Sequence, residues 1–313
     1  MSAADPIPVQ PSATDKVPAH NGQARPKTAL FFVPPPDAIG QLLSAESTVR
    51  PDYQGQSPGL RLAIGAILGV CVCGLFELVA RQVDDVARSP VRVAGVLFAL
   101  VMLASYYFAA RLVPVCTYVG QRGVASYRIG RGRSAKPVET MLLFDHAHEV
   151  RSKQTRHYLN GAYTGTFYDY RWTDTSAHTA FRLQGKHQGN KGFPKAGDKW
   201  HFANAAEIAW SYHLLAQLEQ RLTSDGTIAF PIDKKRSIRV GPGFLEFHFG
   251  GAPVRLTQDE IASVSLNNGQ FSFKHKDAKW YSRQGKYSFP YGEMANAKVF
   301  LLVLEKLMGY RWS

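Results

Sequence analysis

The decisive stretch of the sequence is residues 62–79, LAIGAILGVCVCGLFELV, in which Glu77 is the only charged residue. A second apolar stretch, from Val93 to Ala110, holds no charge and follows the mostly polar residues 81–90. A helix crosses the hydrocarbon core of a bilayer with roughly 20 apolar residues. The sequence therefore predicts two transmembrane helices joined by a short turn, a hairpin that occupies residues 58–113.

Basic residues around this hairpin predict its orientation. Arg111, Arg122, Arg128 and Arg131 follow the second stretch, whereas the connection holds fewer basic residues. Because basic flanks stay on the cytoplasmic side, we expect a multi-pass protein of the cell inner membrane. Both termini and the soluble region are then cytoplasmic. The alternative is a pair of core helices in a soluble protein, which leaves two long apolar runs with so short a connection unexplained.

Charge and composition exclude some classes of protein to which the chain could belong. The chain has 313 residues and a net charge of +13, with 45% hydrophobic and 12% aromatic residues, which excludes a chain disordered throughout. Its three cysteines exclude a disulfide-stapled secreted scaffold. Basic and acidic residues balance in residues 1–110, so the whole net charge falls on residues 111–313. An anionic partner is therefore expected near the second region.

Residues 1–57 are rich in proline and poor in periodic apolar residues, which predicts a disordered tail. The chain start has no basic segment followed by an apolar core, so no signal peptide is expected.

The region after residue 113 alternates apolar and polar residues, which predicts short strands. Asn160-Gly161 is a dipeptide typical of a tight hairpin turn. Two stretches with helical spacing of apolar residues follow, at 205–222 and 294–308.

The second half of this region repeats the order of the first. Residues 243–249 correspond to 123–129, and residues 259–264 correspond to 145–150, each beginning with an aspartate five positions before a valine. We infer two copies of one module. The expected boundaries are 114–225 and 226–313.

Short antiparallel strands followed by one amphipathic helix resemble the pleckstrin-homology-like fold. The stretch YLNGAYTGTFYDYRW at residues 158–172 also resembles bacterial membrane proteins of a family defined only by a domain of unknown function. That resemblance implies an architecture over roughly residues 60–310 and no catalytic residues. The fold class expected is thus an α+β membrane protein. It consists of a two-helix transmembrane hairpin followed by two pleckstrin-homology-like β-barrel or sandwich modules, each ending in an α-helix.

The sequence contains no nucleotide-binding, hydrolase or zinc-protease motif. His146 and His148 would point to one side of a strand beside Asp145, which leaves open an enzyme with a metal or acid/base site there. The second copy has Glu260 and Ala262 at the matching places, so we expect no metal, no cofactor and no catalysis.

Basic and aromatic residues carry the main functional hypothesis: a membrane-tethered cytoplasmic scaffold that binds anionic lipid headgroups or a protein partner. The candidate binding residues are Arg128, Arg131, Arg133, Lys136, Tyr163, Tyr168, Tyr170, Trp172, Lys234, Lys235 and Arg236. Nucleic-acid binding is a further alternative, because Phe271, Phe273, Lys274, Lys276 and Trp280 interleave aromatic and basic side chains. Strand packing explains the same pattern, so nucleic acid is disfavoured.

Overall fold

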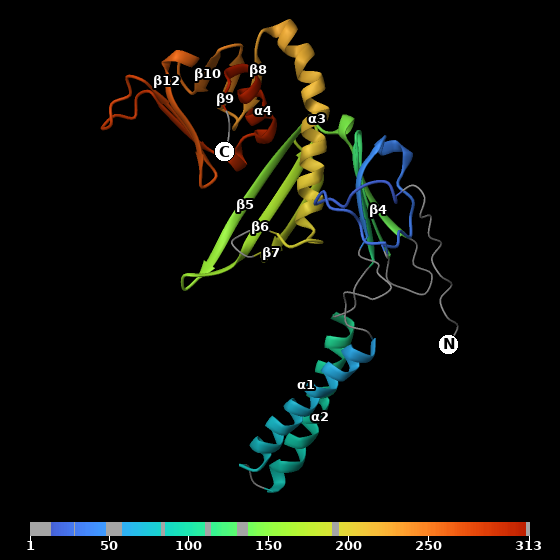
Figure 1. Cartoon of the computed structure of the whole chain (residues 1–313). Helices are drawn as coiled ribbons and strands as arrows, with labels where there is room; N and C mark the ends of the chain where they lie inside the picture. Colours follow the sequence, from blue (N-terminus) through green and yellow to red (C-terminus); the bar gives the residue numbers. More distant parts are fainter. Residues whose placement is uncertain are drawn as a thin grey trace.

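The computed structural model describes residues 14–27, 29–47, 58–82, 85–109, 114–129, 137–189 and 194–310. This part of the chain forms fourteen strands in four antiparallel sheets, together with four α-helices (Figure 1). Helices α1 and α2 form a pair that extends away from the rest of the protein, which we call the body (Figure 1).

The first half of the body contains two sheets and one long helix. One sheet has the order β1 (Leu42–Ser47), β2 (Val115–Gly120), β3 (Gly123–Ile129) and β4 (Pro137–Leu143). The other has the order β5 (Glu149–Leu159), β6 (Ala162–Thr173) and β7 (Thr179–His187), and α3 (Trp200–Asp225) follows it.

The second half follows the same order of sheets and helix. A four-stranded sheet of β8 (Ile228–Pro231), β9 (Arg236–Gly241), β10 (Phe244–Phe249) and β11 (Val254–Thr257) comes first. A three-stranded sheet of β12 (Ile261–Asn267), β13 (Gln270–His275) and β14 (Lys286–Pro290) comes next, and α4 (Ala297–Met308) ends it. One hydrophobic core runs through both halves. The first half contributes Trp172 and Trp210 to it, and the second half contributes Phe230 and Phe271.

The helical pair, α1 (Pro58–Ala80) and α2 (Asp85–Ala109), packs closely through glycines. A Cβ at Gly65 would lie 2.4 Å from a methyl carbon of Leu103, and one at Gly95 would lie 2.6 Å from the Cβ of Phe76. Small residues at these positions let the two helices approach, as in helix pairs within bilayers.

The prediction of a two-helix transmembrane hairpin is wrong. Within the described residues, Leu62–Ala80 in α1 is the one helical stretch long and apolar enough to cross a membrane, by length and composition. The apolar stretch of α2, Ser89–Ala104, is too short. That stretch also contains a charged residue, Arg92, which forms an ion pair with Glu77 of α1 at 2.8 Å. The expected fold class is accordingly replaced by a mixed α/β arrangement of four antiparallel sheets and four α-helices.

The sequence predicts a disordered tail over residues 1–57, but the described residues 14–27 and 29–47 pack against the first sheet or form part of it. Strand β1 pairs with β2, and Phe31, Phe32 and Ile39 are buried against that sheet. Residues 1–13 and 48–57 lie outside the described residues. The first four-stranded sheet therefore begins before the helical pair, not at residue 114.

His20 fixes this early segment to both strands. Its Nδ1 lies 2.8 Å from the Ser44 hydroxyl and its Nε2 lies 2.9 Å from the Thr117 hydroxyl. Burial lowers the pKa of His20 to about 3, so the ring is neutral at pH 7. The ring also contacts Phe202 of α3, which ties the segment to the body.

Candidate functional site

The predicted basic cluster after β3 is only partly within the described residues. Arg128 has an exposed side chain at the end of β3. Arg131, Arg133 and Lys136 lie outside the described part of the chain.

The predicted aromatic cluster is divided between the core and the surface. Tyr168, Tyr170 and Trp172 are 5%, 0% and 0% exposed, because alternate residues of β6 face α3 and the core. Their burial excludes them from a contact surface. Tyr163 lies near the end of the β5–β6 hairpin, where its hydroxyl is 2.7 Å from that of Thr166.

The predicted basic residues Lys234 and Lys235 lie in the turn between β8 and β9, and Arg236 is the first residue of β9. Lys234 and Lys235 are exposed. Arg236 donates to Asp233 at 2.6 Å and to Glu293 at 3.1 Å, so its charge is largely neutralised. This turn belongs to a different sheet from Arg128 and Tyr163, and the structure does not unite the predicted residues into one site.

An open depression lies on the side of the β5–β6–β7 sheet that faces away from α3. We call this side of the sheet the outer face. The depression is about 610 Å³. The register of the three strands places many polar and aromatic side chains on this face, among them Lys153, Thr155, His157, Phe167, Asp169, Arg171, Arg182, Gln184 and Lys186.

The outer face carries an excess of positive charge. Asp169 accepts hydrogen bonds from Arg182 at 2.7 and 2.8 Å and from Arg171 at 3.4 Å. The bonds from Arg182 lower the pKa of this carboxyl below its usual range. One carboxylate is thus shared by two guanidinium groups, and Lys153 and Lys186 add two further charges. Sequence reasoning missed this face, although the alternation of Lys153, Thr155 and His157 along β5 could have indicated it.

The end of the β5–β6 hairpin is apolar and exposed. Asn160 and Gly161 have φ of 48° and 80°, the left-handed conformation that a two-residue hairpin turn requires. Tyr158 and Leu159, just before the turn, are 59% and 67% exposed. The Tyr158 ring contacts that of Tyr163 with centroids 5.8 Å apart.

A more enclosed cleft of about 300 Å³ lies between α3, β8 and the short turn before β5. Asp145 and His148 line it, and His213 of α3 lies 3.5 Å from Asp145. Burial lowers the pKa of His213. Among the described residues, no group of three or more histidine, cysteine or acidic side chains could hold a metal ion. In this part of the chain, His146 and His148 therefore have no third side chain with which they could hold a metal ion.

A buried polar network joins the two halves beside this cleft. Glu207 of α3 accepts a hydrogen bond from Ser152 at 2.6 Å and lies 3.9 Å from the Lys298 ammonium group. Burial raises the pKa of Glu207. Asn296 accepts hydrogen bonds from the Trp210 indole and the Val150 backbone, both at 2.9 Å. All these groups have partners within the fold, which favours a structural role.

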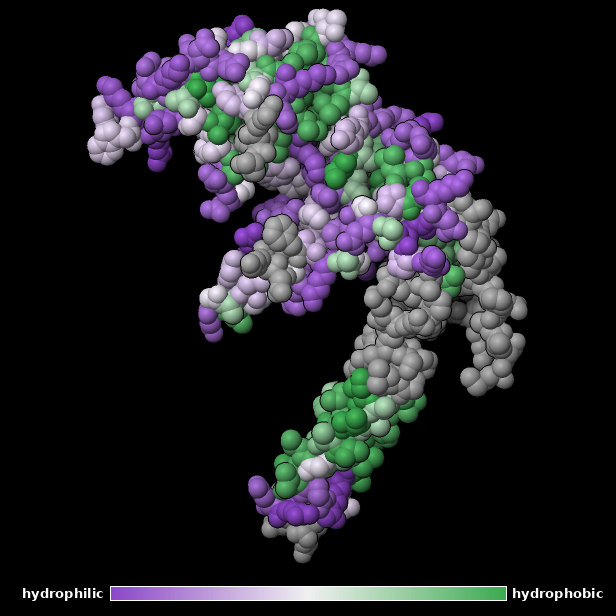
Figure 2. Space-filling model, viewed as in Figure 1, coloured by the Kyte–Doolittle hydropathy of each residue, from purple (hydrophilic) through white to green (hydrophobic). Residues whose placement is uncertain are grey.

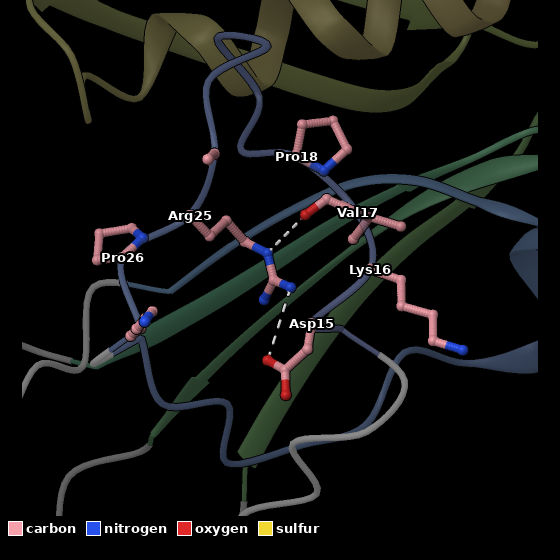
Figure 3. A pocket seen from close by; sticks show the side chains of 8 residues that line it. Asp15, Lys16, Val17, Pro18, Arg25 and Pro26 are labelled. Atoms are coloured by element: carbon pink, nitrogen blue, oxygen red, sulfur yellow. Dashed lines mark hydrogen bonds and ion pairs between the residues drawn. The ribbon is translucent and has the colours of Figure 1, made fainter.

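A third pocket, of about 430 Å³, lies within the early segment, between residues 15–18 and 24–27 (Figure 3). Arg25 donates to the Val17 carbonyl at 2.8 Å and lies 3.8 Å from Asp15 (Figure 3). Its guanidinium carbon also lies 5.1 Å from the centroid of the Phe31 ring. Its guanidinium is therefore occupied by groups of the same segment, whereas the other two basic residues of the pocket, Lys16 and Lys27, are exposed.

Comparison of the chain with family models and with curated proteins gave no match. The resemblance to the pleckstrin-homology-like family of bacterial membrane proteins stays a prediction. Function is therefore argued from the residues of this chain.

Proposed function

We propose that this protein is a membrane-tethered binding protein that is anchored through α1 and binds anionic lipid headgroups with its body. The observation that carries the proposal is the exposure of large apolar side chains on α1. Ile67, Val70 and Leu75 are 62%, 72% and 64% exposed. Removing apolar surface from water is worth about 25 cal/mol per Å². A bilayer supplies that apolar environment along the whole helix.

The surface of the helical pair supports an anchor of this kind. Figure 2 shows a continuous apolar band along the pair, with a hydrophilic tip at the end away from the body. Glu77, near the end of α1, pairs with Arg92 at 2.8 Å and with Arg81 at 3.6 Å. Charged groups beyond an apolar band suit a polar boundary of the bilayer.

The chain leaves and re-enters the body at adjacent strands. β1 precedes α1, β2 follows α2, and the two strands pair in one sheet. The connection from Ala109 to Val115 can reach about 20 Å at most. The anchor therefore holds this sheet close to the bilayer. Because Arg111, Arg122 and Arg128 follow the helical pair within about 20 residues, we assign the body to the cytoplasmic side.

The outer face and the tip of the β5–β6 hairpin suit contact with the same bilayer. The hairpin extends from the body on the side from which the helical pair emerges (Figure 1). Tyr158 and Leu159 would enter the interfacial layer, where aromatic rings are favoured. Lys153 and Lys186 would lie among the headgroups, where each basic residue near an anionic surface contributes about 1 kcal/mol.

Hydrogen exchange of the full-length protein in nanodiscs tests the headgroup contact. Amides of β5 to β7 should exchange more slowly in discs of mixed phosphatidylcholine and phosphatidylglycerol than in phosphatidylcholine alone. The double variant Lys153→Glu/Lys186→Glu should lose this difference, and Lys234→Glu/Lys235→Glu should keep it. Equal exchange in the two kinds of disc would exclude headgroup binding by this face.

A further inference from the structure

The loop between β13 and β14, residues 276–285, exposes two large aromatic side chains. We call it the Trp280 loop. Trp280 is 87% exposed and Tyr281 is 67% exposed. Their rings contact each other edge to face, with centroids 5.6 Å apart. Exposed aromatic groups of this size mark interaction sites.

Hydrogen bonds fix the conformation of this loop. The Lys286 ammonium group donates to the Trp280 carbonyl at 2.9 Å. The Ser282 amide donates to the Lys279 carbonyl at 3.2 Å, and the Gln284 amide donates to the Ser282 hydroxyl at 3.1 Å. The backbone is thus held in a shape that keeps the indole away from the core. An outward tryptophan on an ordered loop is pre-organised for binding.

The charge around Trp280 is strongly positive. Lys276, Lys279 and Arg283 belong to the loop, and within the described part of the chain none of the three forms an ion pair. Lys274 and Lys286 stand at the ends of the flanking strands. Asp277 is the loop's single acidic residue, and its carboxylate lies 3.7 Å from His275. The surface therefore complements a negatively charged partner.

We propose that the Trp280 loop docks an acidic segment of a partner protein in the aqueous phase. The indole would provide the central apolar contact, and the surrounding cations would pair with carboxylates of the segment. Tryptophan and arginine are the residues that most often dominate the energetics of such interfaces.

The bilayer is a poorer occupant because of where the loop lies. The loop forms the orange-red projection at the left of Figure 1, on the far side of the body from the helical pair. This step rests on the proposed anchor, which places the bilayer beside that pair.

Nucleic acid is also a poorer occupant. Phe271 and Phe273, which interleave with the lysines in the sequence, are 0% and 1% exposed. Trp280 and Tyr281 remain, and their ring planes are 89° apart. A run of stacked bases needs successive platforms that are roughly parallel, which this pair does not offer.

Photocrosslinking in native membranes tests the proposal with the full-length protein. A benzoylphenylalanine at position 281 should crosslink to a protein, at a peptide with net negative charge identified by mass spectrometry. Trp280→Ala should reduce the yield at least tenfold. The triple variant Lys276→Glu/Lys279→Glu/Arg283→Glu should abolish it. Lys234→Glu/Lys235→Glu, an exposed basic pair on another turn, should leave the yield unchanged.

Each other outcome would overturn the proposal. Crosslinks confined to lipid would assign the loop to the bilayer, and crosslinks to RNA would assign it to nucleic acid. If no crosslink forms, or if the triple variant leaves the yield unchanged, the loop does not bind an acidic protein segment. Because membrane fractionation of the same samples reports on the anchor separately, failure of the proposed anchor is distinguishable from failure of the docking loop.

Discussion

Ser47, the last residue of β1, pairs with Cys116 of β2 although the two are 69 positions apart in the sequence. The Cys116 thiol donates to the Ser47 hydroxyl at 3.7 Å. The helical pair is therefore an insertion between two neighbouring strands of one sheet. The helical pair can therefore be removed by joining β1 directly to β2.

Replacing residues 48–113 with a short glycine-serine loop should leave a folded body that needs no detergent. β1 and β2 are antiparallel neighbours, so a short loop turns them into a hairpin. Size-exclusion chromatography and near-ultraviolet circular dichroism would report a monodisperse, tertiary-structured protein. The fragment 114–313 is the control, because it loses β1 and uncovers the edge of β2, which favours aggregation. Identical behaviour of the two proteins would argue against the β1–β2 pairing.

His20 should make the body less stable in acid. Its folded pKa of about 3 lies below the unfolded value of about 6.5. Between these values the unfolded state binds a proton that the folded state does not, so stability falls as pH decreases. From pH 7 to pH 5 the free energy of unfolding should fall by about 2 kcal/mol through this group.

Urea unfolding of the loop-replaced body at several pH values measures this effect. His20→Asn should flatten the pH dependence between pH 5 and 7. His178→Asn, in an exposed turn, should leave it as in the parent protein. A parent-like slope in the His20 variant would mean that the ring is not buried in neutral form.

Truncation of Trp172 should lower the free energy of unfolding far more than truncation of Trp280. Trp172 is fully buried, so Trp172→Ala should cost about 3–5 kcal/mol through loss of burial and a cavity. Trp280→Ala should change the free energy of unfolding by less than about 0.5 kcal/mol, because the side chain contacts solvent. Denaturant melts of the two variants provide the comparison. A small effect at Trp172 would show that this side chain is not buried, and it would again be a candidate binding residue.

The hairpin tip should lie at bilayer depth in the anchored protein. A Leu159→Trp variant in vesicles should show added fluorescence that brominated phospholipids quench. Ser176→Trp, in the exposed turn between β6 and β7, serves as the matched control and should not be quenched. Equal quenching of the two, or none at position 159, would separate the tip from the bilayer.

Local patterns predicted much of this architecture. The Asn160-Gly161 turn lies where the dipeptide indicated, and the predicted helical stretch 205–222 falls within α3. The correspondence of residues 123–129 with 243–249 falls on β3 and β10, the third strands of their sheets in chain order. These features depend on neighbouring residues and are therefore visible in the sequence.

Non-local features were not predictable in the same way. The pairing of β1 with β2 depends on contacts across the whole helical pair. Alternation along β6 indicated two faces, but only packing against α3 decides that Tyr168 and Trp172 point inward. Helix α3 begins at Trp200, before the predicted residue 205, because the Asp198 carboxylate accepts the Trp200 amide hydrogen at 2.9 Å. The charged outer face likewise arises only when β5, β6 and β7 are brought into register.

Alkaline carbonate extraction of membranes from cells that produce the full-length chain tests the anchor most directly. The protein should remain in the membrane pellet after carbonate and enter solution only with detergent, whereas the loop-replaced variant should be found in the soluble fraction. Full-length protein that is released by carbonate, folded and dispersed without detergent, would contradict the insertion of α1 into a bilayer.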